Sequence, residues 1–405
     1  MHPAVVIGTC LAVLLLLGVC ERLARDRSRR AVPIRIHING TRGKSTVTRL
    51  IWGALLEAGI PAAAKTTGTA ARLLLPDGTE RRVPRHAPAS IREQLWLLRQ
   101  ARRAGARAVV AECMAVEPEL QWISERQMLS ATIGVITNVR SDHTDVMGRT
   151  LEQGAASLAN TTPTAGVLVV GDRRHLPLFE RRAARMGTRV VSLAADEPED
   201  GALRTWELEN RALALAVTRE LGIPDKVALD GMRRAAHDPG AFKTGTMAIG
   251  GRSVAFIDAT AANDPESLAL LLTGTASSQR PPTNALPADS EDPANQMVVY
   301  NHREDRAERL RVFATDCQYL QHARYLVVTG DRPSVALLRL ARARRGGRPV
   351  LFAARRHLRE VLARLVQTAP EVTRIVFCGN TRRLDVSSVF REELASLARS
   401  SVSDS

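Results

Sequence analysis

Lysine is nearly missing from this sequence. Of its 57 basic residues only four are lysine, and they are Lys44, Lys65, Lys226 and Lys243. The remaining arginines are scattered, so the net charge of +15 is better explained by a general replacement of lysine by arginine than by a surface for nucleic acid. Since ammonium and guanidinium groups differ in shape, a lysine that remains is expected where arginine does not fit.

Aromatic residues and paired cysteines are also scarce. Phe, Tyr and Trp make up 3% of the chain, which is too few for a surface that stacks bases, so we expect no nucleic-acid partner. The five cysteines are widely spaced and contain no Cys-x-x-Cys pair. A disulfide framework is therefore excluded, and a reducing compartment is expected.

Charge is absent from residues 4–20, "AVVIGTCLAVLLLLGVC", and five arginines follow within residues 22–30. Seventeen apolar residues are at the short end for crossing a bilayer. The basic flank on the C-terminal side predicts a single-pass anchor over 1–30, with the rest of the chain in the cytoplasm. A cleaved signal and a buried helix stay open as alternatives.

From residue 33 onward, short apolar runs alternate with helical patterns, which predicts an α/β fold with a parallel sheet. The runs expected as strands are 33–38, 106–112, 131–138, 165–170, 189–193, 253–259, 296–301, 325–330, 348–353 and 374–379. The segments expected as helices are 44–58, 205–221, one from about 265, 304–322, 333–343 and 355–367. A junction near 235–245 predicts a central domain over 31–245 and a smaller Rossmann-like domain over 246–396, with a mobile loop at 275–295 and a disordered tail at 397–405.

The strand-like run 33–38 leads into "NGTRGKST". Glycines allow backbone N–H groups to surround an anion, and the N-terminus of the following helix favours negative charge. Lys44 can reach phosphate oxygens, and the Ser45 hydroxyl can bind Mg²⁺. The heptad from Gly40 to Thr46 is shorter than the full G-x-x-x-x-G-K-[ST] pattern, but its context predicts nucleotide binding.

Further oxygen and nitrogen ligands follow two strand-like runs. Glu112 ends the run 106–112, where an unpaired carboxylate would be costly, so it is expected to bind metal or to form a salt bridge. The run 131–138 opens into a polar cluster formed by Asn138, Asp142, His143 and Asp145. His143 is expected at a metal, Asp142 is expected either to orient His143 or to cap the next helix, and Glu117 is expected in solvent.

With these motifs in hand, the chain resembles the Mur ligase superfamily, whose members are ATP-dependent amide ligases. Within it, the chain is most similar to the poly-γ-glutamate synthase subunits of the CapB or PgsB type. The resemblance rests on "HINGTRGKSTVTRLI", "KTTGTAARLLLPDG", "AECMAVEPELQW", "ITNVRSDHTDVMG" and "ANDPES". It implies a Mur-ligase-like P-loop ATPase domain, then a Rossmann-like domain, after an N-terminal transmembrane helix.

The resemblance also implies roles. Gly40, Thr41, Arg42, Gly43, Lys44, Ser45 and Thr46 would hold the ATP phosphates; Ser45 and Glu112 would hold one Mg²⁺, and His143 a second. Asn210 would lie near adenine, with a helix cap as its alternative. Thr67 and Thr69 would lie near the γ-phosphate or the acceptor, whereas Asp258 and Asn263 would face the nucleotide. For Arg42 and Arg303 the resemblance leaves carboxylate or phosphate pairing open beside simple solvation.

The implied reaction joins glutamate units through γ-amide bonds by way of an acyl phosphate, with Lys44, Glu112 and His143 as the catalytic set. The implied partners are glutamate, the polyglutamate chain, membrane lipid and small membrane-bound synthase and export subunits; we expect an oligomer. No lysine lies between Lys65 and Lys226, so the carbamylated lysine of many Mur ligases is absent. The alternatives are another amino-acid or folylpolyglutamate ligase of the superfamily, a P-loop nucleic-acid ATPase, and a scaffold that binds ATP without turnover.

Overall fold

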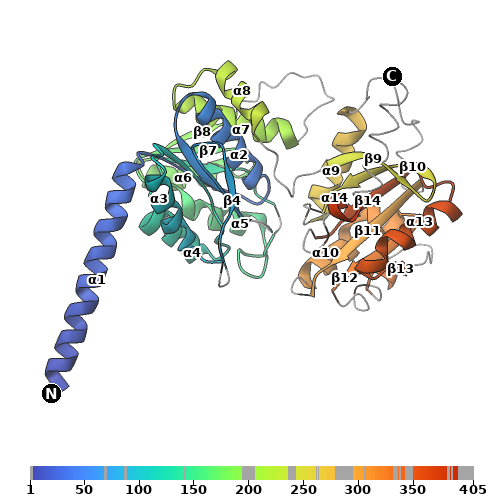
Figure 1. Cartoon of the computed structure of the whole chain (residues 1–405), viewed down its shortest axis with the longest axis horizontal. Coiled ribbons are helices and arrows are strands. Elements are labelled where there is room, and N and C mark those ends of the chain that lie inside the picture. Colours follow the sequence, from blue (N-terminus) through green and yellow to red (C-terminus); the bar gives the residue numbers. More distant parts are fainter. Residues whose placement is uncertain are drawn as a thin grey trace. The chain divides into compact units, whose positions relative to one another are not determined.

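The structure is a computed structural model of the whole chain, in which two compact units are described separately (Figure 1). The first comprises Met1–Glu199 and Glu207–Asp238, and the second Asp200–Trp206 and Pro239–Ser405. The described residues are 3–67, 71–85, 89–140, 142–193, 206–235, 243–260, 262, 264–278, 295–304, 307–331, 336, 339–342, 350–380, 384 and 386–390.

An eight-stranded sheet forms the centre of the first unit, in the order β4-β3-β2-β5-β1-β6-β7-β8. Its strands are β1 (Ile34–Asn39), β2 (Ala62–Lys65), β3 (Arg72–Leu74), β4 (Glu80–Arg82), β5 (Ala108–Glu112), β6 (Ile133–Ile136), β7 (Val167–Val170) and β8 (Arg189–Ser192). All neighbours are parallel except the pairs β2–β3 and β3–β4. The inner parallel strands β2, β5 and β6 are fully buried, as expected when helices cover both faces, whereas the edge strand β8 is partly exposed.

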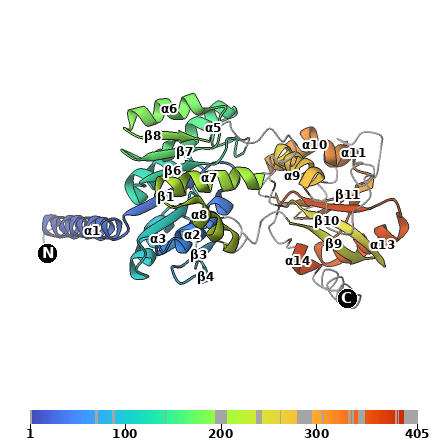
Figure 2. The ribbon, with the colours of Figure 1, turned by 90° about the horizontal axis from the view of Figure 1, so that it is seen from above.

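Helices cover both faces of this sheet (Figure 2). One face packs on α2 (Lys44–Glu57), α7 (Trp206–Glu220) and α8 (Asp225–Arg234). The other packs on α3 (Glu93–Arg103), α5 (Leu151–Leu158) and α6 (Leu176–Arg185). Between β5 and β6 the chain forms α4 (Pro118–Ile123) and a π-helical turn, η1 (Ser124–Leu129), and the 3₁₀ turn η2 (Ala159–Thr161) follows α5.

The N-terminal helix α1 (Pro3–Ala31) runs through the apolar segment and its basic flank without a break. An 18-residue window of it has a mean hydropathy of 2.5 and none of that window is buried, so by length and composition it could cross a membrane. The C-terminal end of α1 packs on α3. The Arg29 guanidinium there donates to the Gln127 and Met128 carbonyls of η1 at 2.6 and 3.0 Å.

The second unit contains a six-stranded sheet in the order β13-β12-β11-β14-β10-β9. Its strands are β9 (Lys243–Ile249), β10 (Arg252–Asp258), β11 (Gln296–His302), β12 (Tyr325–Gly330), β13 (Val350–Phe352) and β14 (Arg374–Cys378), and only β9 is antiparallel to its neighbour. One face packs on α9 (Pro265–Ser278), α10 (Ala307–Asp316) and α11 (Gln318–His322). The other packs on α13 (Leu358–Thr368) and α14 (Val386–Val389), and the 3₁₀ turn η7 (Arg355–His357) precedes α13.

Most expected elements are present, and three expectations need correction or restriction. Helix α9 continues through Ser278, where a loop from 275 was expected; the first prolines of that stretch come only at 281. The expected helix 304–322 is divided into α10 and α11 at Cys317. The rest of the 275–295 loop apart from Asn295, and the 397–405 tail, lie outside the described residues.

Candidate active site

The phosphate loop joins β1 to α2 at the carboxyl edge of the first sheet. In register, Ile38 of β1 lies beside Glu112 of β5 and Asn39 beside Ile136 of β6, so the loop begins between the ends of two parallel strands. Ligands bind at this edge in open α/β sheets.

Two glycines give the loop its shape. Gly40 and Gly43 have φ of 126° and 81°, in the region that favours glycine. A Cβ on Gly40 would lie 2.1 Å from Oγ1 of Thr137, and one on Gly43 would lie 2.3 Å from Oδ1 of Asn210. The loop is therefore packed against β6 on one side and α7 on the other, with no space for side chains at these positions.

Hydrogen bonds to the two residues after β6, Thr137 and Asn138, fix the backbone of the loop. The Thr41 and Arg42 N–H groups donate to the main-chain and side-chain oxygens of Asn138, both at 3.0 Å. Thr137 Oγ1 donates to the Arg42 carbonyl at 2.6 Å. The Lys44 ammonium donates to the Gly40 and Thr41 carbonyls at 2.6 and 3.2 Å, so it lies over the loop in which a phosphate would sit.

Glu112 is the centre of a second cluster. It is 3% exposed, and its carboxylate accepts hydrogen bonds from Ser45 Oγ at 2.8 Å, Thr67 N–H at 2.8 Å and Thr67 Oγ1 at 2.5 Å. Its backbone carbonyl accepts from Gln94 Nε2 at 3.1 Å. Three chain segments that are distant in sequence, from β1–α2, β2 and β5, thus meet on one carboxylate.

This cluster fits the expected magnesium site by its chemistry. It offers two hydroxyl oxygens and a carboxylate beside the phosphate loop, and Mg²⁺ binds through one or two carboxylates together with phosphates and water. Among the described residues, no group of three His, Cys, Asp or Glu side chains converges.

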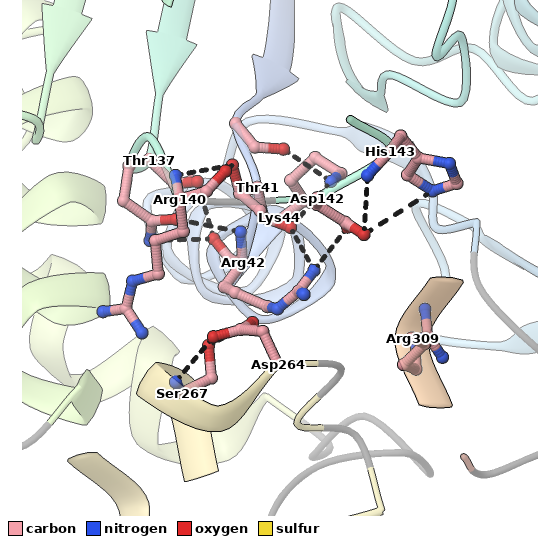
Figure 3. Close-up of polar contacts among 12 residues, drawn as sticks. Thr41, Arg42, Lys44, Thr137, Arg140, Asp142, His143, Asp264, Ser267 and Arg309 are labelled. Atoms are coloured by element: carbon pink, nitrogen blue, oxygen red, sulfur yellow. Dashed lines mark hydrogen bonds and ion pairs between the residues drawn. The ribbon is translucent and has the colours of Figure 1, made fainter. Parts of the chain in front are cut away.

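The loop after β6 carries the expected imidazole. Arg42 NH1 donates to Asp142 Oδ2 at 2.7 Å, and the His143 N–H donates to Asp142 Oδ1 at 3.1 Å; Figure 3 shows Arg42 and Asp142 pointing toward one another beside His143. Of the two roles open for Asp142, orienting His143 fits these contacts. Capping the next helix is wrong, because Thr150 caps α5. His143 itself has φ of 48°, in the left-handed region.

The other predicted residues are placed as follows. Asn210 lies inside α7 and against Gly43, so the alternative of a helix cap is wrong; its contact with adenine stays a prediction. Glu117 is exposed, as expected. In the second unit, Asp258 accepts from the Thr260 N–H and hydroxyl at 3.1 and 2.6 Å, and Arg303 is half-buried. That Asp258 faces the nucleotide, and that Arg303 pairs with a carboxylate or phosphate, stay predictions. Thr69 and Asn263 lie outside the described residues.

Three polar side chains near the site were not predicted. Thr137 was passed over although it lies within the quoted motif "ITNVRSDHTDVMG". Lys65, which is fully buried, forms an ion pair with the partly exposed Glu93, with Nζ 3.0 Å from Oε2. The rarity of lysine was a usable signal for Lys65, but no pattern marked Glu93.

Comparison with known proteins identifies the family. Residues 38–220 match the Mur ligase middle domain, and residues 244–393 match the poly-gamma-glutamate synthase CapB C-terminal domain. The chain is 37% identical over 326 residues to PGA synthase CapB of Bacillus subtilis, covering 79% of this chain and 80% of the relative. The chain belongs to the CapB family. It is also 35% identical over 332 residues to the capsule biosynthesis protein CapB of Bacillus anthracis, covering 80% of this chain and 69% of that relative.

Solved structures confirm the fold of this CapB-family chain. MurF from Acinetobacter baumannii superposes with a TM-score of 0.63 at 14% identity, covering 93% of this chain and 80% of MurF. Folylpolyglutamate synthase of Mycobacterium tuberculosis, solved with ADP and AMPPCP, gives 0.61 at 17% identity, covering 95% and 98%. The fold is that of the Mur ligases and folylpolyglutamate synthases, and the chain is an ATP-dependent ligase.

Proposed function

We propose that this chain transfers the γ-phosphoryl group of ATP to a glutamate carboxylate and joins the resulting acyl phosphate to a second glutamate through a γ-amide bond. The observation that carries the proposal is the Glu112 cluster, in which the hydroxyl of the phosphate loop shares one carboxylate with Thr67. The names of the relatives, PGA synthase and capsule biosynthesis protein, support poly-γ-glutamate as the product.

The chain's own residues prepare the phosphoryl transfer. N–H groups of the loop from Gly40 to Thr46 and the start of α2 would bind the phosphates, and the Lys44 ammonium would exchange its loop carbonyls for phosphate oxygens. Mg²⁺, held by Ser45, Glu112 and Thr67, would neutralise negative charge on the phosphates. Most of the catalytic gain in such transfers comes from positioning and charge neutralisation.

The reaction then balances in two steps. A carboxylate oxygen bonds to the γ-phosphorus while the bond to ADP breaks. The amine nitrogen of the incoming glutamate bonds to the acyl carbon, phosphate leaves, and the amine loses a proton. Thr69, Asp258, Asn263 and Arg303 are proposed on the substrate side, His143 at a second ion, and Asn210 near adenine; these roles rest on the family resemblance.

Location and partners form part of the proposal. The apolar helix α1 supports a single-pass membrane anchor with both units in the cytoplasm, where ATP is available. Synthesis at the membrane suits a polymer that leaves the cell. Small membrane-bound synthase and export subunits are the proposed partners, together with self-association into an oligomer.

The test supplies a membrane fraction with ATP, Mg²⁺ and labelled glutamate and measures labelled polymer and ADP. Lys44→Ala is the matched inactive variant. We expect labelled polymer and glutamate-dependent ADP from the wild type and neither from the variant. ADP release that depends on DNA or RNA, or labelled folate conjugates in place of polymer, would reject the proposal.

A further inference from the structure

Lys65 is a fully buried lysine directly behind the Glu112 cluster. It is the last residue of β2, and it lies in register beside Ala111, the residue before Glu112 on β5. Its side chain has no solvent exposure. Burying an ammonium is costly unless it is paired, so its presence requires a reason.

The first turn of α3 supplies the pairing. Lys65 Nζ lies 3.0 Å from Glu93 Oε2 and 3.9 Å from the Met114 sulfur. Glu93 also accepts from the Arg85 guanidinium at 2.8 and 3.1 Å, so one carboxylate serves two cations. Burial lowers the pKa of Lys65, whereas Glu93 and, more weakly, Glu112 act to raise it.

The same helical turn also holds the backbone of Glu112. Gln94, next to Glu93, donates to the backbone carbonyl of Glu112 at 3.1 Å and is itself fully buried. Adjacent side chains at the start of α3 therefore hold the end of β2 through Lys65 and the end of β5 through Glu112. Two residues beyond Lys65, Thr67 makes two hydrogen bonds to the Glu112 carboxylate.

We propose that Lys65 is a positioning residue for the divalent-metal site: its ammonium, clamped on Glu93, sets the backbone that presents Thr67 to Glu112. This inference rests on the proposed function only in taking the Glu112 cluster as the metal site. Within the described residues, the hydrogen bonds of the Lys65 ammonium go to Glu93 and Met114 and not to Ser45 or the phosphate loop. It follows that the affinity for metal depends on Lys65 and the affinity for metal-free nucleotide does not.

Lysine suits this place better than arginine. In a chain where 53 of 57 basic residues are arginine, a lysine persists at a position with no exposure, where its ammonium is hydrogen-bonded to the Glu93 carboxylate. A compact ammonium fills such a site, whereas the broad guanidinium needs room for several donors.

The experiment uses the full chain in detergent micelles, with Lys65→Met and Glu93→Gln as test variants. Lys226→Met is the matched control, since Lys226 is an exposed lysine on α8. Free Mn²⁺ is followed by electron paramagnetic resonance during titration in the presence of ADP, and ADP binding without metal is measured by calorimetry. Glutamate-dependent ADP formation then gives the half-saturating concentration of Mg²⁺.

For Lys65→Met we expect Mn²⁺ to bind about tenfold more weakly to the ADP complex, and half-saturating Mg²⁺ to rise by a similar factor, as for residues that orient metal ligands. ADP affinity without metal should match the wild type. Glu93→Gln should also weaken Mn²⁺ binding, but by a smaller factor, because Arg85 still orients the side chain at position 93. This variant also tests the inference if Lys65→Met does not fold.

A folded Lys65→Met or Glu93→Gln protein with a lower Tm but unchanged Mn²⁺ and Mg²⁺ dependence would overturn the inference, since the pair would then serve stability alone. Wild-type protein that binds Mn²⁺ with ADP yet forms no polyglutamate would reject the proposed function and leave this inference standing. The two failures are therefore distinguishable.

Discussion

Replacing Gly43 by alanine tests whether the phosphate loop has the shape described. Gly43 combines a left-handed backbone, φ 81°, with an amide oxygen of Asn210 only 2.3 Å from where a Cβ would lie. Ordinary contacts of a Cβ begin at 3.4 Å, so the Asn210 side chain or the loop must move by about 1 Å. Asn210 is 5% exposed, which leaves it little room to retreat.

The loss of stability expected for Gly43→Ala has two parts. A left-handed conformation costs a residue with a Cβ about 1–2 kcal/mol, and overpacking typically adds about 1–3 kcal/mol. Gly43→Ala should therefore lower the free energy of unfolding by about 2–5 kcal/mol. Gly222 has a similar φ of 71° with nothing within 4 Å of its Cβ, so Gly222→Ala isolates the backbone part.

The assay is denaturant unfolding of both variants, with ADP binding measured by calorimetry. We expect Gly43→Ala to bind ADP at least about tenfold more weakly, since a displacement of this size spoils anion geometry. Adding Asn210→Ala should restore part of the lost stability, because it removes the clashing amide. The reasoning is refuted if Gly43→Ala costs no more stability than Gly222→Ala and leaves ADP binding unchanged.

Three further outcomes follow from the contacts. Thr67→Val removes one hydrogen bond to Glu112 and should weaken Mn²⁺ binding by a factor of about ten, measured by equilibrium titration with Thr67→Ser as the control that keeps the hydroxyl. Burial opposes the charged form of His37, but the neighbouring Cys113 and Glu125 side chains raise its pKa to about 10. Stability should therefore fall between about pH 6.5 and about 10, and His37→Gln should flatten that slope in Tm measurements. Glu80→Gln weakens the pairing of Arg49, which is 2% exposed, and should cost about 3 kcal/mol in denaturant unfolding; a loss below about 1 kcal/mol would contradict it.

The local sequence pattern was sufficient to predict the main helices and strands. The helix expected over 44–58 is Lys44–Glu57, and the strand expected over 325–330 is Tyr325–Gly330. The structure brings the phosphate loop together with both polar strand ends: Ser45 bonds to Glu112, and Arg42 bonds to Asp142. Parallel strands end at one edge of the sheet, so motifs that follow such strands are expected at that edge.

Short strands without a strong apolar pattern were missed. β2 reads "AAAK" and β3 reads "RLL", and neither alternates clearly enough to predict a strand. β2 takes its place by pairing with β5, which is distant in sequence, and β3 pairs with β2. For this reason the contacts of Glu112 with Thr67, just after β2, and with Gln94 of α3 were not foreseen.

The sequence by itself determined the chemistry: a glycine-shaped anion loop with its lysine, a carboxylate and an imidazole after apolar strands, and an uncharged N-terminal run, because each depends on residue types at short spacing. Only the tertiary structure decided which side chains serve that chemistry together. The order β2-β5-β1 places Thr67 on Glu112 and Lys65 behind it, and α7 places Asn210 over Gly43. These contacts are made between segments 45 to about 170 residues apart, where strand pairing and packing, rather than local sequence, determine what touches what.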